Sequence, residues 1–386
     1  MPIMEIKNLK KTADRIEQAI NSQEKIILYG DADLDGVTSV IILQETIESL
    51  GGEVSAIYFP DREEEGYGIS VKALNLLKKL SPALFVALDC GISNFEEIRL
   101  ARKLGFEVIV IDHHEILDNL PEAEIIVDPK QPGDEYHFKE LATAGIVFKL
   151  TQNLLAGKMS QNLRNNFLEL AALATIADMM PQTGENKDLI EGGIFSLENS
   201  WRPGIQAFLE DKILLNYNSP QKISKIISLL NVRDVENNLP APFRLLTSTS
   251  LDEAKIIISR LKEKAELRRE KIGMIIEEIK ERVSEKKDPL IFEGDETFDL
   301  SLISTVASSF CQEYQKPVFI FKKLKEESQG TVRTPPEINS IQLMKKCRKH
   351  LISFGGHPQA SGFRIKNENL EEFKKCLTEN LKNKNY

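Results

Sequence analysis

Residues 26–36 read Ile26-Ile27-Leu28-Tyr29-Gly30-Asp31-Ala32-Asp33-Leu34-Asp35-Gly36, an apolar run followed by three aspartates at alternate positions. Three further acidic or His-bearing turns also follow apolar stretches: Asp89-Cys90-Gly91, Asp112-His113-His114 and Ala177-Asp178. Carboxylates close together repel one another unless a cation neutralises them. We therefore expect these turns to meet around bound metal at one edge of a parallel sheet, as in a metal-dependent phosphoesterase.

The first half of the chain alternates short apolar runs with longer amphipathic segments. The candidate strands are residues 25–29, 54–59, 84–88, 108–111 and 125–127. The candidate helices are residues 9–20, 38–50, 71–80 and 95–104. Strand–helix alternation at this spacing predicts an α/β fold with a parallel, doubly wound sheet. Ligands of such sheets bind beyond the carboxyl ends of the strands, where the acidic turns fall.

The second half predicts a connector and a smaller domain. Residues 251–286 read as one long charged helix, and a second strand–helix pattern follows Asp288-Pro289 and ends in a glycine-rich turn at Gly355-Gly356-His357. We expect a catalytic domain over residues 1–199, a helical connector over residues 200–286 and a smaller α/β domain over residues 287–386.

Composition sets wide limits. Of 386 residues, 41% are hydrophobic and 28% charged, as is ordinary for a soluble globular protein. The start of the chain has no signal pattern, and no uncharged apolar run approaches the roughly 20 residues of a membrane span. We expect no membrane association and a cytoplasmic location. Because the four cysteines are far apart and form no C-x-x-C pair, neither a zinc site nor a disulfide framework is expected.

The net charge of −9 taken alone disfavours a nucleic-acid partner. A metal site itself requires acidic residues, so the overall sign carries little weight.

The chemistry of the acidic turns favours two divalent ions. Oxygen ligands suit Mg²⁺, and a single imidazole such as His113 moves the preference toward Mn²⁺. A calcium-binding EF-hand is disfavoured because its twelfth loop position would be Ile42 in place of glutamate, and a strand-like run precedes the loop. A haloacid-dehalogenase-type phosphatase fits Asp33-Leu34-Asp35-Gly36-Val37 locally but does not explain the Asp112-His113-His114 turn.

A His-His pair after a strand is more often structural than catalytic, and Asp112 changes that balance here. Asp112 would fix the tautomer of one imidazole from outside the metal site. His114 would then be free to face a substrate phosphate.

Further motifs follow in order along the chain. They are Gly30 to Ser39, Phe59-Pro60-Asp61-Arg62, Glu65-Gly66-Tyr67-Gly68, Asp89-Cys90-Gly91-Ile92, Ile111-Asp112-His113-His114, Ala144 to Leu150, Ala174 to Pro181, Gly184-Glu185-Asn186 and Arg202-Pro203-Gly204. Together they resemble the DHH phosphoesterase superfamily, specifically its RecJ-like single-strand exonucleases. Asp89-Cys90-Gly91 and the Gly-Tyr-Gly turn favour that branch over the nanoRNases.

This resemblance implies a DHH catalytic domain, a long helical connector and a DHH-associated domain, with the active site in the cleft between the two domains. It implies two Mn²⁺ ions, with Mg²⁺ as the alternative. The metal ligands carried over by motif are Asp33, Asp35, Asp89, His113 and Asp178, with Asp31 close by. His114 and His357 would contact the scissile phosphate, and Gly355 and Gly356 would let the backbone approach it.

Two stretches of the chain bear on how the end of the substrate is held. Gly330-Thr331-Val332-Arg333-Thr334 resembles the family's phosphate-binding loop, in which Thr331, Arg333 and Thr334 would hold a terminal phosphate; the alternative is a surface turn before Pro335. Residues 230–235 retain Asn231 but lack the family's leading arginine. Either Arg233 substitutes from a shifted position, or that phosphate contact is lost. We expect no OB-fold after the second domain.

The function implied is a 5′→3′ exonuclease that releases nucleoside monophosphates from single-stranded DNA, or that favours short oligonucleotides. A helicase or single-strand-binding protein is an expected partner. Two alternatives stay open: a nanoRNase or cyclic-dinucleotide phosphodiesterase on the same fold, and a non-catalytic replication scaffold. The scaffold is disfavoured because every ligand position is filled.

Overall fold

The computed structural model describes residues 5–62, 64–116, 119–211, 217–283 and 288–383, and for His357 the backbone alone. The chain divides into two compact units, residues 1–262 and 263–386. The predicted domain boundaries at 199/200 and 286/287 stay a prediction.

A five-stranded parallel sheet forms the centre of the first unit, with the order β2-β1-β3-β4-β5. Its strands are β1 (Ile26–Gly30), β2 (Val54–Tyr58), β3 (Ala83–Leu88), β4 (Phe106–Ile111) and β5 (Ile125–Val127). Because β1 pairs with β2 on one side and β3 on the other, the chain changes direction across the sheet at β1. A crevice for ligands is expected at such a switch point.

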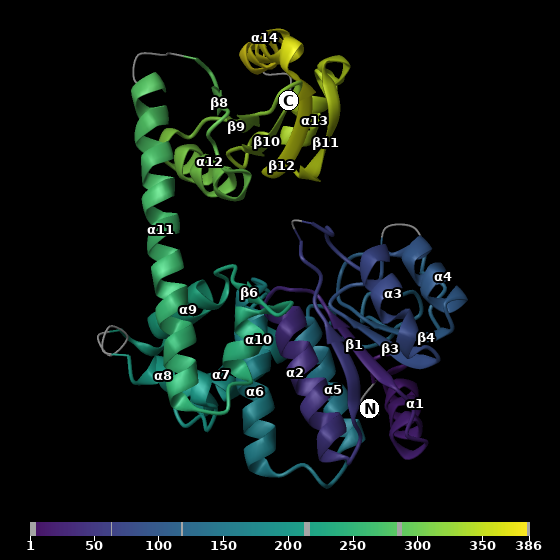
Figure 1. Cartoon of the computed structure of the whole chain (residues 1–386). Helices are drawn as coiled ribbons and strands as arrows, with labels where there is room; N and C mark the ends of the chain where they lie inside the picture. Colours follow the sequence, from purple (N-terminus) through teal and green to yellow (C-terminus); the bar gives the residue numbers. More distant parts are fainter. Residues whose placement is uncertain (1–4, 63, 117–118, 212–216, 284–287, 384–386) are drawn as a thin grey trace. The chain divides into compact units, whose positions relative to one another are not determined.

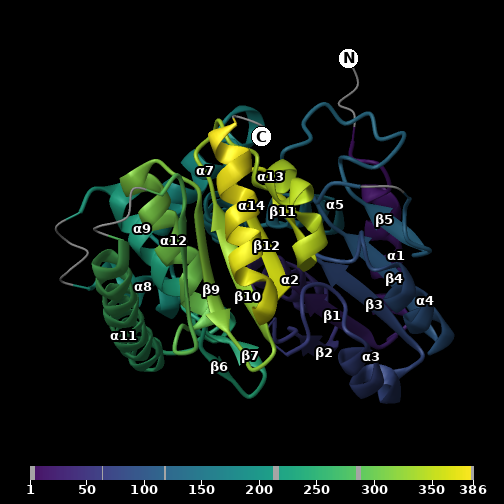
Figure 2. The same ribbon diagram turned by 90° about the horizontal axis from the view of Figure 1, so that it is seen from above.

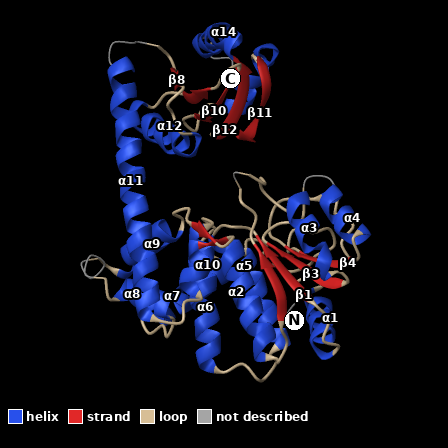
Figure 3. Ribbon diagram, viewed as in Figure 1, coloured by secondary structure: helices blue, strands red, loops and turns tan. Residues whose placement is uncertain are grey.

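Helices cover both faces of this sheet, as Figures 1 and 3 show. Leu28 packs with α1, α2, α5 and α6, whereas its neighbour Tyr29 packs with α3 and α4, because successive strand residues point to opposite faces. The helices are α1 (Leu9–Asn21), α2 (Leu34–Ser49), α3 (Val71–Leu77), α4 (Phe95–Lys103), α5 (Thr143–Leu154) and α6 (Gln161–Ala177). The predicted doubly wound α/β fold is confirmed.

The predicted start of α2 was four residues late. The helix begins at Leu34, so Asp35 and Gly36 lie in its first turn. The rest of the first unit is mainly helical. Its elements are α7 (Gly184–Leu197), α8 (Pro203–Leu209), α9 (Ser219–Leu230), the hairpin β6 (Val235–Glu236) and β7 (Leu239–Pro240), and α10 (Ala241–Leu246).

The long charged helix α11 runs over Leu251–Val283, and the rest of its predicted span, residues 284–286, lies outside the described residues. Ala254 and Leu261 pack into the core of the first unit, and Ile279 and Val283 into a core of the second.

The second unit holds a mixed sheet with the order β11-β12-β10-β9-β8. Its strands are β8 (Ile291–Asp295), β9 (Val318–Lys323), β10 (Glu327–Arg333), β11 (Leu351–His357) and β12 (Ala360–Lys366). The β8–β9 pair is parallel and the others are antiparallel. Side chains of α12 (Leu300–Tyr314) belong to one core of this unit, and those of α13 (Ser340–Lys346) and α14 (Leu370–Lys382) belong to another. Figure 2 shows α14 lying across the sheet.

Two predicted loops of this unit are strands, which corrects the sequence interpretation. Gly355 and Gly356 lie within β11 and pair with β12, and residues 330–333 lie within β10 between β9 and β12. Two of the glycines allow close strand packing: a Cβ on Gly330 would approach the Ile320 carbonyl oxygen to 2.6 Å, and one on Gly356 would approach the Ala360 carbonyl oxygen to 2.7 Å.

The expectation of no disulfide is wrong for one pair of cysteines. Cys347 and Cys376 form a disulfide in the second unit, because folding brings the segment after α13 against α14. Separation along the sequence hid this proximity. Among the described residues, no helix combines the length and apolarity needed to cross a membrane.

Candidate metal centre

The turn after β1 presents three aspartates at the carboxyl edge of the sheet. Asp33 caps α2, accepting hydrogen bonds at Oδ1 from the backbone N–H groups of Asp35 and Gly36, both at 3.1 Å. Asp31 and Asp35 are each 1% exposed. A Cβ at position 36 would lie 2.4 Å from the carbonyl oxygen of Asp31, so this turn requires glycine.

The start of α5 holds Asp35 in place. The backbone N–H groups of Thr143 and Ala144 donate to the two carboxylate oxygens of Asp35, each at 2.8 Å. The Thr143 hydroxyl donates to Asp89 Oδ1 at 3.1 Å. A helix N-terminus favours an adjacent anion. One helix start therefore orients two carboxylates from two different strand ends.

His113 lies among three carboxylates. Its Nε2 is 3.4 Å from Asp89 Oδ1, 3.5 Å from Asp178 Oδ2 and 3.8 Å from Asp35 Oδ2. Both ring nitrogens of His113 are buried and have no hydrogen-bond partner among the described residues. Buried polar atoms in native proteins are nearly always satisfied, so an unpartnered imidazole facing carboxylates indicates a site for a cation.

The pKa shifts of this cluster follow from burial and from the closeness of its carboxylates. Burial, then the neighbouring Asp33, raises the pKa of Asp35 to about 7. Burial and the charge of Asp35 raise the pKa of Asp89 well above its usual value, and burial also raises the pKa of Asp178. Burial lowers the pKa of His113 to about 4, which leaves its imidazole neutral. A neutral imidazole and carboxylate oxygens are suitable ligands for Mn²⁺.

Arg62 neutralises the outer part of the cluster. Its Nε donates to Asp31 Oδ1 at 3.0 Å and its Nη2 to Asp33 Oδ2 at 2.8 Å, and Nη2 also pairs with Asp31 Oδ2. The sequence analysis gave Arg62 as part of a motif and predicted no role for it. Arg62 is 31 and 29 residues from Asp31 and Asp33 along the chain, so this pairing could not be predicted from local sequence.

Asp89 has a constrained backbone. Its φ is 62°, in the left-handed region that non-glycine residues seldom adopt, and its N–H donates to the Ile111 carbonyl at 3.0 Å. The Tyr67 hydroxyl donates to the Asp89 carbonyl at 3.2 Å. Such conformations persist where surrounding structure enforces them, often at functional sites.

Asp112 orders the second histidine. Its Oδ1 lies 2.7 Å from His114 Nδ1 and accepts from the His113 N–H at 2.8 Å, and its Oδ2 accepts from the Ile92 N–H at 3.1 Å. Burial alone would raise the pKa of Asp112, but the hydrogen bond and charge of His114, the hydrogen bond from the Ile92 N–H and the charge of His113 together lower it. Burial opposes protonation of His114, yet Asp112 raises its pKa. The imidazole that Asp112 holds is therefore that of His114.

Tyr67 is a candidate that sequence reasoning did not assign. Its hydroxyl lies 3.2 Å from His114 Nδ1 and 3.3 Å from Nε2, and the two rings meet edge to face. A second missed residue is Thr143, described above. Tyr67 was quoted only within the Glu65 to Gly68 motif, and Thr143, the first residue of α5, precedes the motif that begins at Ala144.

Three groups of side chains have the spacing of metal ligands. Within each group the ligand atoms lie within 4.8 Å of one another, and the groups are Asp89-His113-His114, Asp35-His113-Asp178 and Asp31-Asp33-Asp89. The structure thus brings together the predicted residues Asp31, Asp33, Asp35, Asp89, His113 and Asp178. The donor set fits divalent metal; which residues are ligands stays a proposal.

The predicted substrate residues of the second unit have structural partners. Arg333 Nε donates to the Ser308 hydroxyl at 3.1 Å and its Nη2 to the Ser304 hydroxyl at 2.5 Å, which ties β10 to α12. Thr331 accepts from Arg333 Nη1 at 3.0 Å. Thr334 lies just beyond β10 and donates to the Ile338 carbonyl at 2.6 Å.

The side chain of His357 lies outside the described residues, so its predicted phosphate contact stays a prediction. The backbone of His357 pairs with Ala360 across the β11–β12 hairpin, and Ala360 pairs with Arg333 on its other side. The predicted phosphate-binding residues Arg333 and His357 therefore occupy one row across three strands.

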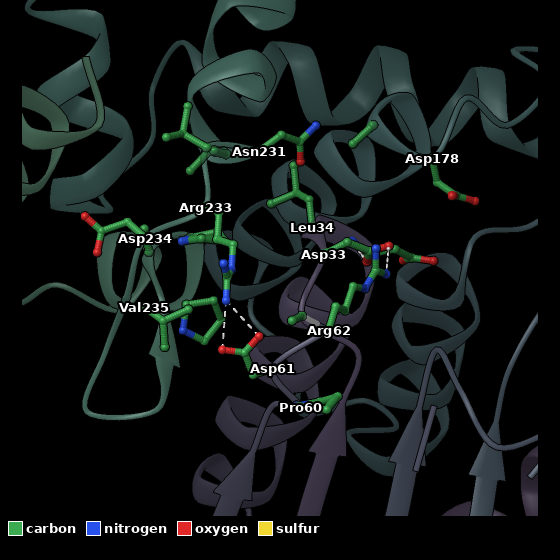
Figure 4. A pocket seen from close by; sticks show the side chains of 18 residues that line it. Asp33, Leu34, Pro60, Asp61, Arg62, Asp178, Asn231, Arg233, Asp234 and Val235 are labelled. Atoms are coloured by element: carbon green, nitrogen blue, oxygen red, sulfur yellow. Dashed lines mark hydrogen bonds and ion pairs between the residues drawn. The ribbon is translucent and has the colours of Figure 1, made fainter. Parts of the chain in front are cut away.

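A pocket of about 410 Å³ opens beside the metal centre (Figure 4). Asp33, Asp35 and Asp178 form part of its wall. The remaining wall includes Leu34, Asn231, Arg233 and proline residues from the β6–β7 hairpin region. A pocket lined by both apolar and charged side chains next to a candidate metal centre is suited to hold part of a small or extended ligand.

Two family matches cover most of the chain. Residues 25–175 match the DHH family, N-terminal domain, and residues 287–383 match the DHHA1 domain. The chain is 33% identical over 382 residues to the single-stranded-DNA-specific exonuclease RecJ of Bacillus subtilis, covering 97% of this chain and 48% of that protein. It is 28% identical to RecJ of Thermus thermophilus, covering 97% of this chain and 54% of that protein.

The chain therefore spans about half the length of these two relatives. Among solved structures, an exonuclease RecJ bound to manganese superposes with a TM-score of 0.81 at 26% identity, covering 99% of this chain and 96% of that chain. The resemblance read from the motifs is confirmed. The chain thus carries the N-terminal domain of the DHH family and a DHHA1 domain, and it is homologous to RecJ over nearly all of its length.

Proposed function

We propose that this chain is a metal-dependent phosphodiesterase that acts as a single-stranded DNA exonuclease and releases nucleoside monophosphates. The observation that carries the proposal is the unpartnered Nε2 of His113 among the carboxylates of Asp35, Asp89 and Asp178. The RecJ relatives, named as single-stranded-DNA-specific exonucleases, support the choice of substrate.

The residues proposed to hold metal are Asp33, Asp35, Asp89, His113 and Asp178, with Asp31 close by. We propose two ions and a preference for Mn²⁺, with Mg²⁺ as the alternative; the related RecJ structure bound to manganese supports this choice. Divalent ions would supply the Lewis acidity that phosphodiester hydrolysis requires. The carboxylates would hold these ions in place, since Asp35 and Asp89 are each fixed by hydrogen bonds from the start of α5.

His114 is proposed to contact the scissile phosphate. Because Asp112 Oδ1 accepts from Nδ1, the proton on that nitrogen is held, and Nε2 is left to donate when the ring is protonated. The raised pKa of His114 favours the protonated ring, which would offset negative charge developing on the phosphate. Asp112 thus orders the donor, as a carboxylate often does for a site histidine.

The second unit is proposed to bind the nucleic acid through Thr331, Arg333, Thr334, Gly355, Gly356 and His357. Arg333 presents a planar guanidinium suited to a phosphate. We also propose 5′→3′ polarity, a helicase or single-strand-binding protein as partner, and a cytoplasmic location.

The test offers purified protein and Mn²⁺ a length ladder of internally labelled single-stranded DNA and RNA, each with a 5′-phosphate. We expect steady conversion of long DNA to mononucleotides and no conversion with Asp89→Asn. Glu122→Gln, which breaks an exposed ion pair with Arg99, is the control and should match the parent chain. Cleavage confined to oligomers of a few nucleotides would favour the nanoRNase alternative. Absence of cleavage of every substrate would favour a non-catalytic scaffold.

A further inference from the structure

Helix α6 ends in a tight turn directly beside the metal centre. The N–H of Met179 donates to the Ile176 carbonyl at 3.2 Å. The N–H of Met180 donates to the Thr175 carbonyl at 3.1 Å. With Asp178 as the C-cap, these two hydrogen bonds form a Schellman motif, and Met179 occupies the position after the cap. Its φ of 55° lies in the left-handed region that this motif requires.

Glycine is the residue that this position favours, because at positive φ a Cβ crowds the following carbonyl oxygen. The chain has glycine at the same position after α2 and α4, at Gly51 and Gly105. Apart from Met179, the described non-glycine residues with positive φ all have polar side chains; they are Asn8, Gln23, Asp89, Asn237, Asn238 and Gln315. Met179 is thus the one apolar residue in this conformation within the described part of the chain.

Packing within the chain does not compensate for the strain at Met179. Met179 is 89% exposed, whereas Met180, the next residue, is 9% exposed. A single exposed apolar residue is ordinary on a protein surface. An exposed methionine where glycine would relieve strain gains nothing for the folded state. The apolar side chain of Met179 therefore points to a contact with a bound molecule.

The place of Met179 at the rim of the metal centre indicates what that molecule is. Consecutive Cα atoms lie about 3.8 Å apart. Asp178, the residue before Met179, has its Oδ2 3.5 Å from His113 Nε2 and lines the pocket of Figure 4. Under the proposed function, the molecule bound there is a single DNA strand. The phosphates of a strand pair with charged groups, so its bases and sugars are the parts that an apolar side chain can contact.

We propose that Met179 is a substrate-binding residue whose side chain packs against a base of the single strand close to the scissile phosphate. A base presents an apolar aromatic face, and the thioether sulfur of methionine makes favourable contacts with aromatic rings. Methionine is unbranched and flexible, so the contact does not depend on which base is present. The inference rests on the proposed function because it takes a DNA strand as the occupant.

The experiment combines Met179→Ala with removal of single bases. The substrates are 5′-phosphorylated single strands of DNA, one unmodified and the others with an abasic site moved one nucleotide at a time from the 5′ end. Steady-state kinetics in Mn²⁺ give KM and kcat for each strand. On the unmodified strand we expect Met179→Ala to raise KM roughly fivefold with little change in kcat, as for loss of one partly buried apolar contact. On the strand that lacks the contacted base, Met179→Ala and the unsubstituted chain should have equal KM values.

Three further variants separate this role from a structural one. Met179→Leu keeps an apolar side chain of similar size and should keep the low KM. Met179→Gly should raise KM as Met179→Ala does, while its melting temperature should not fall, because glycine relieves the strain of positive φ. A structural role would instead lower the melting temperature. Met274→Ala removes another exposed methionine, 64% exposed on α11, and should leave KM unchanged.

An unaltered KM in Met179→Ala would overturn the inference, as would a rise in KM that persists on every abasic strand. The proposed function is judged separately on the DNA ladder. Cleavage with an unaltered KM would remove only the role of Met179. Should no strand be cleaved, fluorescence anisotropy with the same strands replaces the kinetics. A base-dependent loss of affinity in Met179→Ala would then keep the contact and remove the exonuclease, whereas absence of that loss would remove both.

Discussion

His113 Nε2 lies 3.4 Å from Asp89 Oδ1, and neither ring nitrogen of His113 has a hydrogen-bond partner among the described residues. Asp89 and His113 follow neighbouring strands, β3 and β4, and are 2% and 5% exposed. A buried carboxylate and a buried neutral imidazole at this distance, with Asp35 and Asp178 beside them, are stabilised once a cation joins them.

Substitution of Asp89 should therefore separate metal binding from folding. We expect Asp89→Asn to abolish hydrolysis and to lose the rise in melting temperature that Mn²⁺ gives the unsubstituted chain, since ligand binding to the folded state stabilises it. Differential scanning calorimetry with Mn²⁺ and with chelator measures this. An equal Mn²⁺-dependent rise in Asp89→Asn would contradict the assignment. Glu122→Gln should behave like the unsubstituted chain.

Removal of the Tyr67 hydroxyl should impair catalysis more than binding. The hydroxyl lies within 3.3 Å of both ring nitrogens of His114 and donates to the Asp89 carbonyl. Loss of one such hydrogen bond corresponds to about a tenfold fall in kcat for Tyr67→Phe. Steady-state kinetics on single-stranded DNA give kcat and KM separately. A pure rise in KM would instead make Tyr67 a substrate contact.

Glu169 should make stability depend on pH. Burial raises its pKa to about 7 from the ordinary 4.5, despite the opposing effect of the Arg202 guanidinium. A raised pKa means that the folded state binds the proton more tightly than the unfolded state. This contribution is full below pH 4.5 and is lost as the pH rises through about 7.

The measurement is the free energy of unfolding by urea between pH 4.5 and 8, for the unsubstituted chain and for Glu169→Gln. The difference between the two should change by about 3 kcal/mol across that range, with the unsubstituted chain losing stability relative to the variant as pH rises. Two parallel curves would show that Glu169 does not titrate in this window.

Replacement of Arg333 should weaken binding of 5′-phosphorylated single strands more than of hydroxyl-ended ones. Because Arg333 also donates to Ser304 and Ser308, Arg333→Ala should cost about 1 kcal/mol of stability as well. Fluorescence anisotropy with both kinds of end measures the first effect. Arg364→Ala is the matched control, since Arg364 is on the neighbouring strand β12 and pairs with Glu327. An equal loss of affinity for both kinds of strand would show that Arg333 contacts the nucleic-acid backbone without recognising its terminal phosphate.

Local patterns were sufficient for the first sheet and for the convergence of its acidic turns. The apolar runs before Asp31, Asp89 and Asp112 have the length of buried strands, and the carboxyl ends of parallel strands share one edge. These residues had to converge once the strands paired. The start of α2 was misplaced because Asp33 provides its cap, so Leu34 to Val37 could join the helix.

Local patterns failed where partners are distant. Residues 330–333 and 355–357 contain glycine, which by itself favours a turn. In the structure, residues 330–333 pair with β9 and β12, and residues 355–357 pair with β12, so both segments are strands. Cys347 and Cys376 pair across 29 residues for the same reason.

The sequence by itself therefore determined the class of fold, the position of the acidic turns after the strands and the carboxylate chemistry that these turns share. Periodicity and strand-end position are local properties, so they can be read without the tertiary structure. Only the tertiary structure decided that Thr143 orients Asp35 and Asp89. It also decided that the side chain of Asp112 contacts the imidazole of His114 and not that of His113, and that Asp61 pairs with Arg233. Those contacts join segments 54 to 172 residues apart, or select between adjacent side chains, and packing alone sets them.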